Sequence, residues 1–116
     1  MKNAKPPKNI KIGVHKYKIV VDKAAIDACS VSGGGDPRVG ECNNEQLTIT
    51  LDPSLAPSML QETLLHEILH AAFHFIGASE DVDDKTEEKL VLRLSPVLMG
   101  IMKSNPKLMS YLAPVT

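Results

Sequence analysis

The residues best suited to chemistry are two histidines and a glutamate in the segment His66-Glu67-Ile68-Leu69-His70. A spacing of four residues places the two imidazoles on one face of a helix, about 40° apart and one turn above each other. Both rings can then reach one metal ion at roughly 2.0 to 2.1 Å, and zinc accepts two nitrogen ligands from one helix because it imposes no rigid geometry. The spacing therefore predicts a zinc (Zn²⁺) site on His66 and His70.

Glu67 is the next residue around the helix from His66, so its carboxylate can lie near the metal without binding it. From there it can take a proton from water as the water attacks a carbonyl group, and later pass the proton to the leaving amine. A metal paired with a base in this way hydrolyses peptide bonds. We therefore expect Glu67 to be the catalytic residue.

The pattern is unusual for so short a chain. With four His and seven Glu in 116 residues, about 0.008 matches are expected by chance. The alternative is a pair of hydrogen-bonded core histidines. Two histidines and a glutamate are costly to bury on an otherwise apolar helix unless they have a partner, and a metal supplies one.

The third metal ligand must come from another element, because a catalytic zinc usually has three protein ligands and keeps a fourth position for water. Glu87 and Glu88 follow His70 by 17 and 18 residues. Glu87 shares the apolar, core-facing stripe of its helix and is the first choice, with Glu88 second. Cys42 is a further alternative; otherwise Cys42 and Cys29 are ordinary thiols.

Other polar residues can lie at the edge of such a site. His74 is one turn beyond His70 and is expected at the surface or at the edge of the cleft. His15, Tyr17 and Tyr111 are further candidates for donating a hydrogen bond to a developing oxyanion, but spacing fixes the position of none of them. The alternative for each is an ordinary hairpin or tail residue.

The elements that must position these residues fall into two halves. Alternating β-branched residues predict β structure in the first half, and helical periodicity dominates the second. The expected elements of the first half are strands at 10–14 and 17–21 in a hairpin, a short helix or turn at 22–29, a glycine-rich loop at 32–37, a short strand around 39–42 and a strand at 47–51.

The second half predicts a long central helix that starts after Asp52-Pro53, ends at Gly77 and is mostly surrounded by protein. A second helix is expected to start in the acidic stretch 80–88, and Pro96 should kink or split it, leaving a further helical piece at 97–104. One more turn is expected around Leu108. The fold class is therefore α+β, with a small, mainly antiparallel sheet packed on the central helix and on a second C-terminal helix.

Composition limits the other function classes. The net charge of −1 combines +6 over residues 1–23 with −7 over the rest, and this balance argues against a surface adapted to nucleic acid. No apolar run reaches the roughly 18 residues of a membrane span, and two cysteines are too few for a disulfide scaffold. We expect a flexible basic tail at 1–9, one domain at 10–112, a cytoplasmic location, and neither membrane nor nucleic acid as a partner; the oligomeric state is left open.

Three segments carry a resemblance to a known family: Thr63–Ala71, Glu87–Leu94 and Asn105-Pro106. They look like the small metallopeptidase-like proteins of tailed bacteriophages and prophages, which are minimal zincins related to the gluzincin-type ImmA/IrrE and the SprT-like metallopeptidases. The resemblance spans roughly residues 10–112. It implies zinc on His66 and His70, Glu67 as general base, a carboxylate ligand from the helix that holds Glu87, and a host cytoplasm as the location.

The sequence thus predicts a zinc-dependent metallopeptidase with a protein or peptide substrate. The alternative is an inactive metal-binding module of the same fold that serves as a structural or protein-binding phage protein. A fourth zinc position that is open to water would favour catalysis, and one filled by a protein side chain would favour the structural role.

Overall fold

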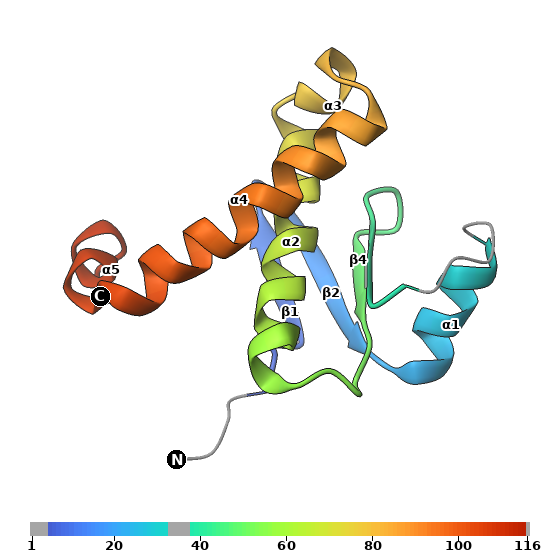
Figure 1. Ribbon diagram of the computed structural model, residues 1–116, viewed down its shortest axis with the longest axis horizontal. Coiled ribbons are helices and arrows are strands. Elements are labelled where there is room, and N and C mark those ends of the chain that lie inside the picture. The colour runs from blue at the N-terminus through green and yellow to red at the C-terminus, as the bar shows by residue number, and fades with distance from the viewer. Residues whose placement is uncertain (1–4, 33–37, 116) are drawn as a thin grey trace.

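The computed structural model describes residues 5–32 and 38–115 and has the mixed α+β fold that the sequence predicts (Figure 1). The first four residues of the predicted tail and residues 33–37 of the predicted glycine-rich loop lie outside the described residues. Strand β1 begins at Asn9, next to the predicted end of the tail. Within the described residues, no helix is both long and apolar enough to cross a membrane.

Four strands form one sheet in the order β1-β2-β4-β3. The strands are β1 (Asn9–Ile12), β2 (His15–Val21), β3 (Gly40–Asn43) and β4 (Thr48–Leu51). β1 pairs antiparallel with β2, and β3 pairs antiparallel with β4, whereas β2 and β4 run parallel because helix α1 (Lys23–Ser32) lies in the connection between them. The mainly antiparallel sheet of the prediction is therefore confirmed, and β3 forms one of its edges.

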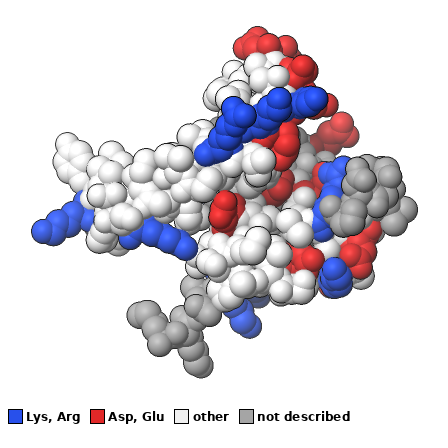
Figure 2. Space-filling model, viewed as in Figure 1, with Lys and Arg blue, Asp and Glu red and all other residues white. Residues whose placement is uncertain are grey.

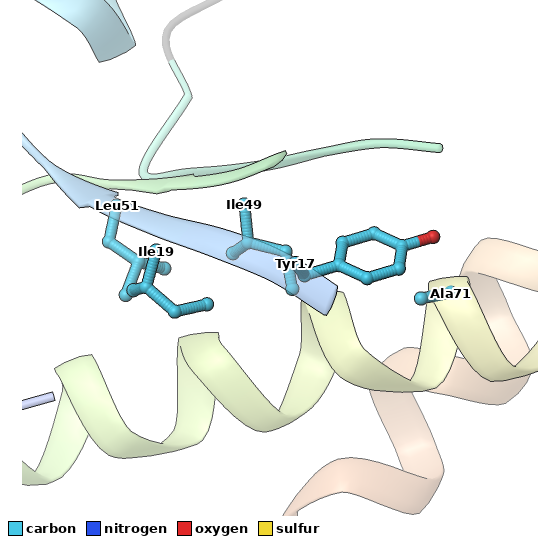
Figure 3. Packing of buried hydrophobic residues seen from close by; sticks show 5 residues of the cluster. All are labelled: Tyr17, Ile19, Ile49, Leu51 and Ala71. Atoms are coloured by element: carbon cyan, nitrogen blue, oxygen red, sulfur yellow. The ribbon is translucent and has the colours of Figure 1, made fainter. Parts of the chain in front are cut away.

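One face of the sheet packs against the central helix α2 (Pro57–Phe75) and forms the core (Figure 3). Side chains two residues apart on a strand point to the same face, so Tyr17 and Ile19 of β2 and Ile49 and Leu51 of β4 all face the helix. Ala71 meets them from α2, with no exposed surface of its own. Each fully buried Ile or Leu contributes about 1.5 to 3 kcal/mol, so this layer holds α2 firmly on the sheet.

The central helix starts later than predicted, at Pro57 rather than directly after Asp52-Pro53. Proline disfavours helical backbone in the residue before it, and Ala56 accordingly has an extended conformation, with φ −59° and ψ 151°. Asp52 does not cap the helix; its carboxylate accepts hydrogen bonds from the backbone and the hydroxyl of Ser54 and closes a turn. The end of the helix matches the prediction, because Gly77 follows it with φ 77°.

The expectation that α2 is mostly surrounded by protein is wrong. Only Glu67 and Ala71 are buried on this helix, and most of its other apolar side chains are partly exposed. A single small sheet covers one side of the helix and one further helix covers another, which leaves the remaining side open.

Three helices follow: α3 (Ala78–Asp81), α4 (Asp84–Ser104) and α5 (Pro106–Leu112). α4 crosses α2 and runs through Pro96 as one helix, so the predicted separate piece at 97–104 is its second half. Pro96 removes one donor to the Leu92 carbonyl; because Leu92 is exposed, water can replace that bond. Beyond Pro96, α4 projects away from the sheet and ends at α5 (Figure 1).

Candidate metal centre

The two histidines of the motif lie where α4 begins beside α2. Asp83 caps α4 through a 2.7 Å hydrogen bond from the Thr86 backbone N–H, so the first turn of that helix is fixed. The helices α2 and α4 pack against each other, and Ala71 on α2 and Val91 on α4 are both fully buried. Glu87 and Glu88 thereby reach the histidines of α2.

Four atoms from three side chains converge at this point. The Nε2 atoms of His66 and His70 lie 3.2 Å apart. The Glu88 carboxylate bridges them, with Oε1 at 2.9 Å from His66 Nε2 and Oε2 at 2.8 Å from His70 Nε2. One ligand atom from each of the three residues lies within 4.8 Å of the other two.

This spacing fits a metal ion. Two ligand atoms of a tetrahedral zinc, each bound at roughly 2.0 to 2.1 Å, lie about 3.3 Å from each other. The 3.2 Å between the two histidine nitrogens matches that separation. The Glu88 oxygens lie a little closer, at hydrogen-bond distance, and a small rotation of this partly exposed side chain would bring them to ligand distance. His66, His70 and Glu88 can therefore hold a metal ion.

Glu87 lies on the other side of the His70 ring. Its Oε2 is 2.7 Å from His70 Nδ1, and its Oε1 accepts a 2.5 Å hydrogen bond from the Ser79 hydroxyl of α3. A carboxylate on the second ring nitrogen fixes the orientation of a metal-binding histidine. The converging ligand atoms therefore include Glu88, the second choice from the sequence, whereas Glu87, the first choice, contacts the opposite nitrogen of His70.

The Glu67 carboxylate lies close to β3, because a Cβ atom at Gly40 would come within 2.8 Å of its Oε2. Its side chain is only 7% exposed, and among the described residues no hydrogen bond or ion pair holds its carboxylate. Burial, opposed by His70 and reinforced by Glu88 and Glu41, raises the pKa of Glu67 to about 7. A carboxyl group with this pKa exchanges a proton readily at neutral pH.

The two histidines differ in their electrostatic surroundings. Burial lowers the pKa of His66, and the Glu88 carboxylate only partly offsets that effect. Burial also acts to lower the pKa of His70, but the hydrogen bond to Glu87 and the nearby carboxylates outweigh it, so the pKa of His70 is raised. Burial acts to raise the pKa of Glu87, but the hydrogen bonds that its carboxylate accepts from Ser79 and His70 outweigh burial, so the pKa is lowered.

The centre opens into a cleft of about 750 Å³. Its walls are the start of α4, one face of α2 and strand β3 with the residues just before it. β3 pairs only with β4 among the described residues, so its outer edge has backbone groups that no other described strand uses. The lining includes the two histidines, Glu67 and Glu88, together with Gly40 and Glu41 of β3.

Two features of the β3 wall were not anticipated from the sequence. Gly40 lies so close to α2 that a Cβ atom there would come within 2.8 Å of Glu67 Oε2 and 2.7 Å of Thr63 Cγ2. An isolated glycine in a strand pattern is a known sign of close backbone approach, so this signal was present in the sequence. Arg38 forms a 2.6 Å ion pair with Glu41 at the cleft, for which the spacing of the residues gave no indication.

Three of the residues suggested for the edge of the site do not line the cleft. His74 is exposed, as expected for a surface residue, and lines a neighbouring hollow. His15 is exposed and stacks on Phe75 at 5.0 Å between ring centroids. Tyr111 is 82% exposed on α5 and does not line the cleft.

The Tyr17 hydroxyl and the Cys42 thiol both contact the same side-chain oxygen, Oδ1 of Asn44. Tyr17 is fully buried, and its hydroxyl donates a 2.6 Å hydrogen bond to Asn44 Oδ1. The Cys42 thiol lies 3.3 Å from the same oxygen. Burial, with Glu67, Glu41 and Glu87 nearby, raises the pKa of Cys42 to about 12, which keeps it a thiol. Cys42 therefore lines the cleft but does not join the converging ligand atoms.

Comparison of the chain with protein-family models, with curated proteins and with solved structures found no match.

Proposed function

We propose that the protein is a zinc-dependent metallopeptidase with a minimal zincin fold. One observation carries this proposal: three side chains that can bind a metal converge beside the largely buried carboxylate of Glu67, at the wall of an open cleft. Burial of a carboxylate disfavours its charged form, and such a group is retained where chemistry needs a proton acceptor.

The ligand set supports zinc as the ion. Two imidazoles and one carboxylate form a common ligand set of catalytic zinc. Among the described residues the cluster contains three ligands, which leaves a position for a reactant on the side of the cleft. When bound, zinc would supply a Lewis acid that polarises a carbonyl group and makes water acidic.

Glu67 is suited to move the proton. Its pKa of about 7 lets the carboxylate accept a proton from an attacking water and then release it to a leaving amine at neutral pH. Since no side chain among the described residues competes for its oxygens, the carboxylate is available to the reactants. Glu87 holds the His70 ring in place meanwhile through its 2.7 Å contact with Nδ1.

Strand β3 supports a peptide as the substrate. An extended peptide can add to the free edge of a sheet through backbone hydrogen bonds, and β3 supplies such an edge along the cleft. Gly40 and Glu41 would bring that peptide alongside Glu67. A substrate in this position has its carbonyl groups close to both the base and the metal ligands.

The alternative function, an inactive metal-binding module, would be favoured by a fourth protein ligand. The described residues supply three ligands to the cluster, and the cleft beside them is open. A phage origin and a cytoplasmic location stay predictions from the sequence.

The test compares the wild-type protein with the Glu67→Gln variant, both loaded with zinc and incubated with a library of unstructured peptides that is read by mass spectrometry. We expect about one zinc per chain in both proteins and cleavage that falls by roughly 10² to 10⁴ in the variant, because only the base is lost. Glu80→Gln, on the exposed helix α3, is the matched control and should cleave like the wild type. Equal cleavage by the Glu67→Gln variant, or a zinc-loaded wild type that cleaves no peptide, would contradict the proposal.

A further inference from the structure

The second half of α4 and helix α5, residues 97–112, form a projection that we call the arm. In Figure 1 the arm extends well beyond the sheet and the other helices. α5 packs mainly on α4 and has no buried residue. A helix as short as α5, with seven residues, is marginal in water without a packing partner, so a further surface would stabilise this end of the arm.

A line of exposed apolar side chains runs along α4 into the arm. Leu90 and Leu94 are 43% and 39% exposed, and Val97 and Ile101 are 58% and 40% exposed. Their spacing of four, three and four residues keeps them within an arc of about 60° on the helix. This is the spacing of a coiled-coil seam, in which two helices pack along matching apolar lines. We call these four residues the α4 seam.

The fold covers this seam only in part, because its four side chains remain 39% to 58% exposed. α4 packs on α2 through a different line, on which Val91 and Ser95 are buried and which is rotated from the seam by about 100°. The seam is therefore a second apolar face, and it begins on the part of α4 that α2 supports and ends on the arm.

The charges along α4 select the orientation of a second helix. Residues 80–88, around the start of α4, carry six acidic residues and one basic residue, whereas the arm carries two basic residues, Lys103 and Lys107, and no acidic one. In Figure 2 red surface is seen at the α3 end, and none is seen on the arm. An antiparallel neighbour places each basic arm near the acidic end of the other helix, and a parallel neighbour would place like charges together.

We propose that two copies of this chain form a two-fold symmetric dimer through the α4 seam, with the two α4 helices antiparallel. A two-fold axis near Ser95 places Leu94 against the partner's Val97 and Leu90 against the partner's Ile101. Each arm then rests on the part of α4 that α2 holds in the other copy. One self-complementary surface closes the assembly at two copies.

The size of the seam sets the expected affinity. A helix of 21 residues is about 30 Å long, so one helix pair with help from α5 forms a small interface. Stable interfaces bury roughly 1,200 Å² or more in total, and we place this one at that lower end. We therefore expect a dissociation constant in the micromolar range.

The first test measures the mass of the full chain in solution by sedimentation equilibrium. At roughly 50 µM we expect twice the chain mass of 12.6 kDa. The double variant Leu94→Glu, Val97→Glu should be a monomer with an unchanged circular dichroism spectrum. The control Val14→Glu alters another exposed valine, on the β1–β2 turn, and should stay dimeric. A wild-type monomer at roughly 100 µM, or a dimeric double variant, would overturn the proposal.

The second test checks the orientation and keeps most of the seam intact. The variants Leu90→Cys and Ile101→Cys are made in a background with Cys29→Ser and Cys42→Ser, and are oxidised separately and as a mixture. The antiparallel register predicts cross-linked chains only in the mixture, because identical positions lie about 16 Å apart in the dimer. Self-cross-linking of each variant alone, or no cross-link in any sample, would rule out this register.

Discussion

Glu87 and Glu88 are adjacent in sequence but act on opposite sides of one imidazole ring. Histidine has two ring nitrogens, and metal binding at Nε2 leaves Nδ1 for a carboxylate that orients the ring. Glu87 is the more buried of the two, with a side chain 13% exposed against 54% for Glu88. The more buried acid therefore contacts the back of the ring, and the more exposed one reaches the metal position at the open cleft.

The sequence predicts the pair of histidines in the motif, but it does not determine which glutamate completes the set of ligands. The spacing of His66 and His70 fixes their common direction wherever the helix lies, so this pair could be predicted. The apolar stripe that includes Glu87 correctly indicated burial. It could not distinguish a ligand from a residue behind the ring, because that depends on how α4 crosses α2, and the crossing is a tertiary property.

Glu67 makes the metal-free protein sensitive to pH. Its pKa rises from 4.5 to about 7 on folding, so the folded state binds the proton more tightly and stability falls as the pH rises from about 4.5 to about 7. The Glu67→Gln variant lacks this ionisation. We expect it to be more stable than the wild type at about pH 8 by up to about 3 kcal/mol, with a smaller difference near pH 4.5.

Urea unfolding of both proteins in the presence of a chelator measures this difference. A variant that is less stable than the wild type at about pH 8 would show that the ionised carboxylate is not strained by burial.

Gly40 leaves space for the Glu67 carboxylate beside β3. A Cβ atom at residue 40 would come within 2.8 Å of Glu67 Oε2, so Gly40→Ala should displace the carboxylate. We expect peptide cleavage to fall by roughly 10² and zinc binding to be unchanged, because misplacing a catalytic group by about 1 Å has an effect of that size.

Gly100→Ala is the matched control, since nothing lies within 4 Å of a Cβ atom at that helical position. It should preserve cleavage. Full cleavage by the Gly40→Ala variant would mean that β3 can move away from α2 without consequence for the base.

At the scale of elements, the packing of α4 on α2 brings the candidate metal ligands together. Val91 is fully buried on the face of α4 that meets α2, one turn after Glu87 and Glu88. Val91→Ala should cost about 2 kcal/mol of unfolding free energy through lost burial and the cavity that remains. Zinc affinity should fall as well, because Glu88 loses its fixed position.

The control for this change is Val14→Ala, at a valine that is 95% exposed, which should leave both quantities unchanged. Denaturant unfolding and zinc titration measure the two effects. A loss of stability without any loss of zinc affinity would separate the packing of α4 from the metal centre.

Strands and helix ends that depend on neighbouring residues could be predicted from the sequence. How deeply each element is buried in the fold could not. The alternation of apolar residues and threonine located β4, and Gly77 located the end of α2. The sequence predicts that α2 starts after Asp52-Pro53, because proline is favoured at the first position of a helix. Pro57 is a second proline with the same preference, and the helix begins there. The apolar pattern of α2 also suggested burial on all sides, because a pattern does not reveal that only a four-stranded sheet and α4 are available to cover it.

At the scale of the molecule, charge is divided along the chain. Residues 24–88 have a net charge of −11, whereas residues 1–23 and 89–116 have +6 and +4. Most residues that line the cleft come from the acidic segment 24–88. They include Glu41, Glu62 and Asp84 in addition to the residues of the candidate metal centre. An acidic cleft attracts cations, which favours both a divalent metal ion and a basic peptide.

We therefore expect faster cleavage of peptides rich in Lys and Arg than of neutral ones, measured as kcat/KM at low salt. The advantage should shrink as salt screens the cleft, over a Debye length of about 8 Å at 0.15 M. Glu62→Gln should reduce it as well. A salt-independent preference would show that side-chain pockets, and not charge, select the substrate.

The central claim is that His66, His70 and Glu88 bind one metal ion while Glu87 only orients His70, and zinc titration of four proteins tests it most directly. The wild type should bind about one zinc per chain, and His66→Ala should lose that binding. Glu87→Gln should weaken binding by roughly 10- to 100-fold, as expected for a residue that orients a ligand, and Glu88→Gln should weaken it further. Wild-type affinity in the Glu88→Gln variant, or a wild-type protein that binds no zinc, would contradict the account.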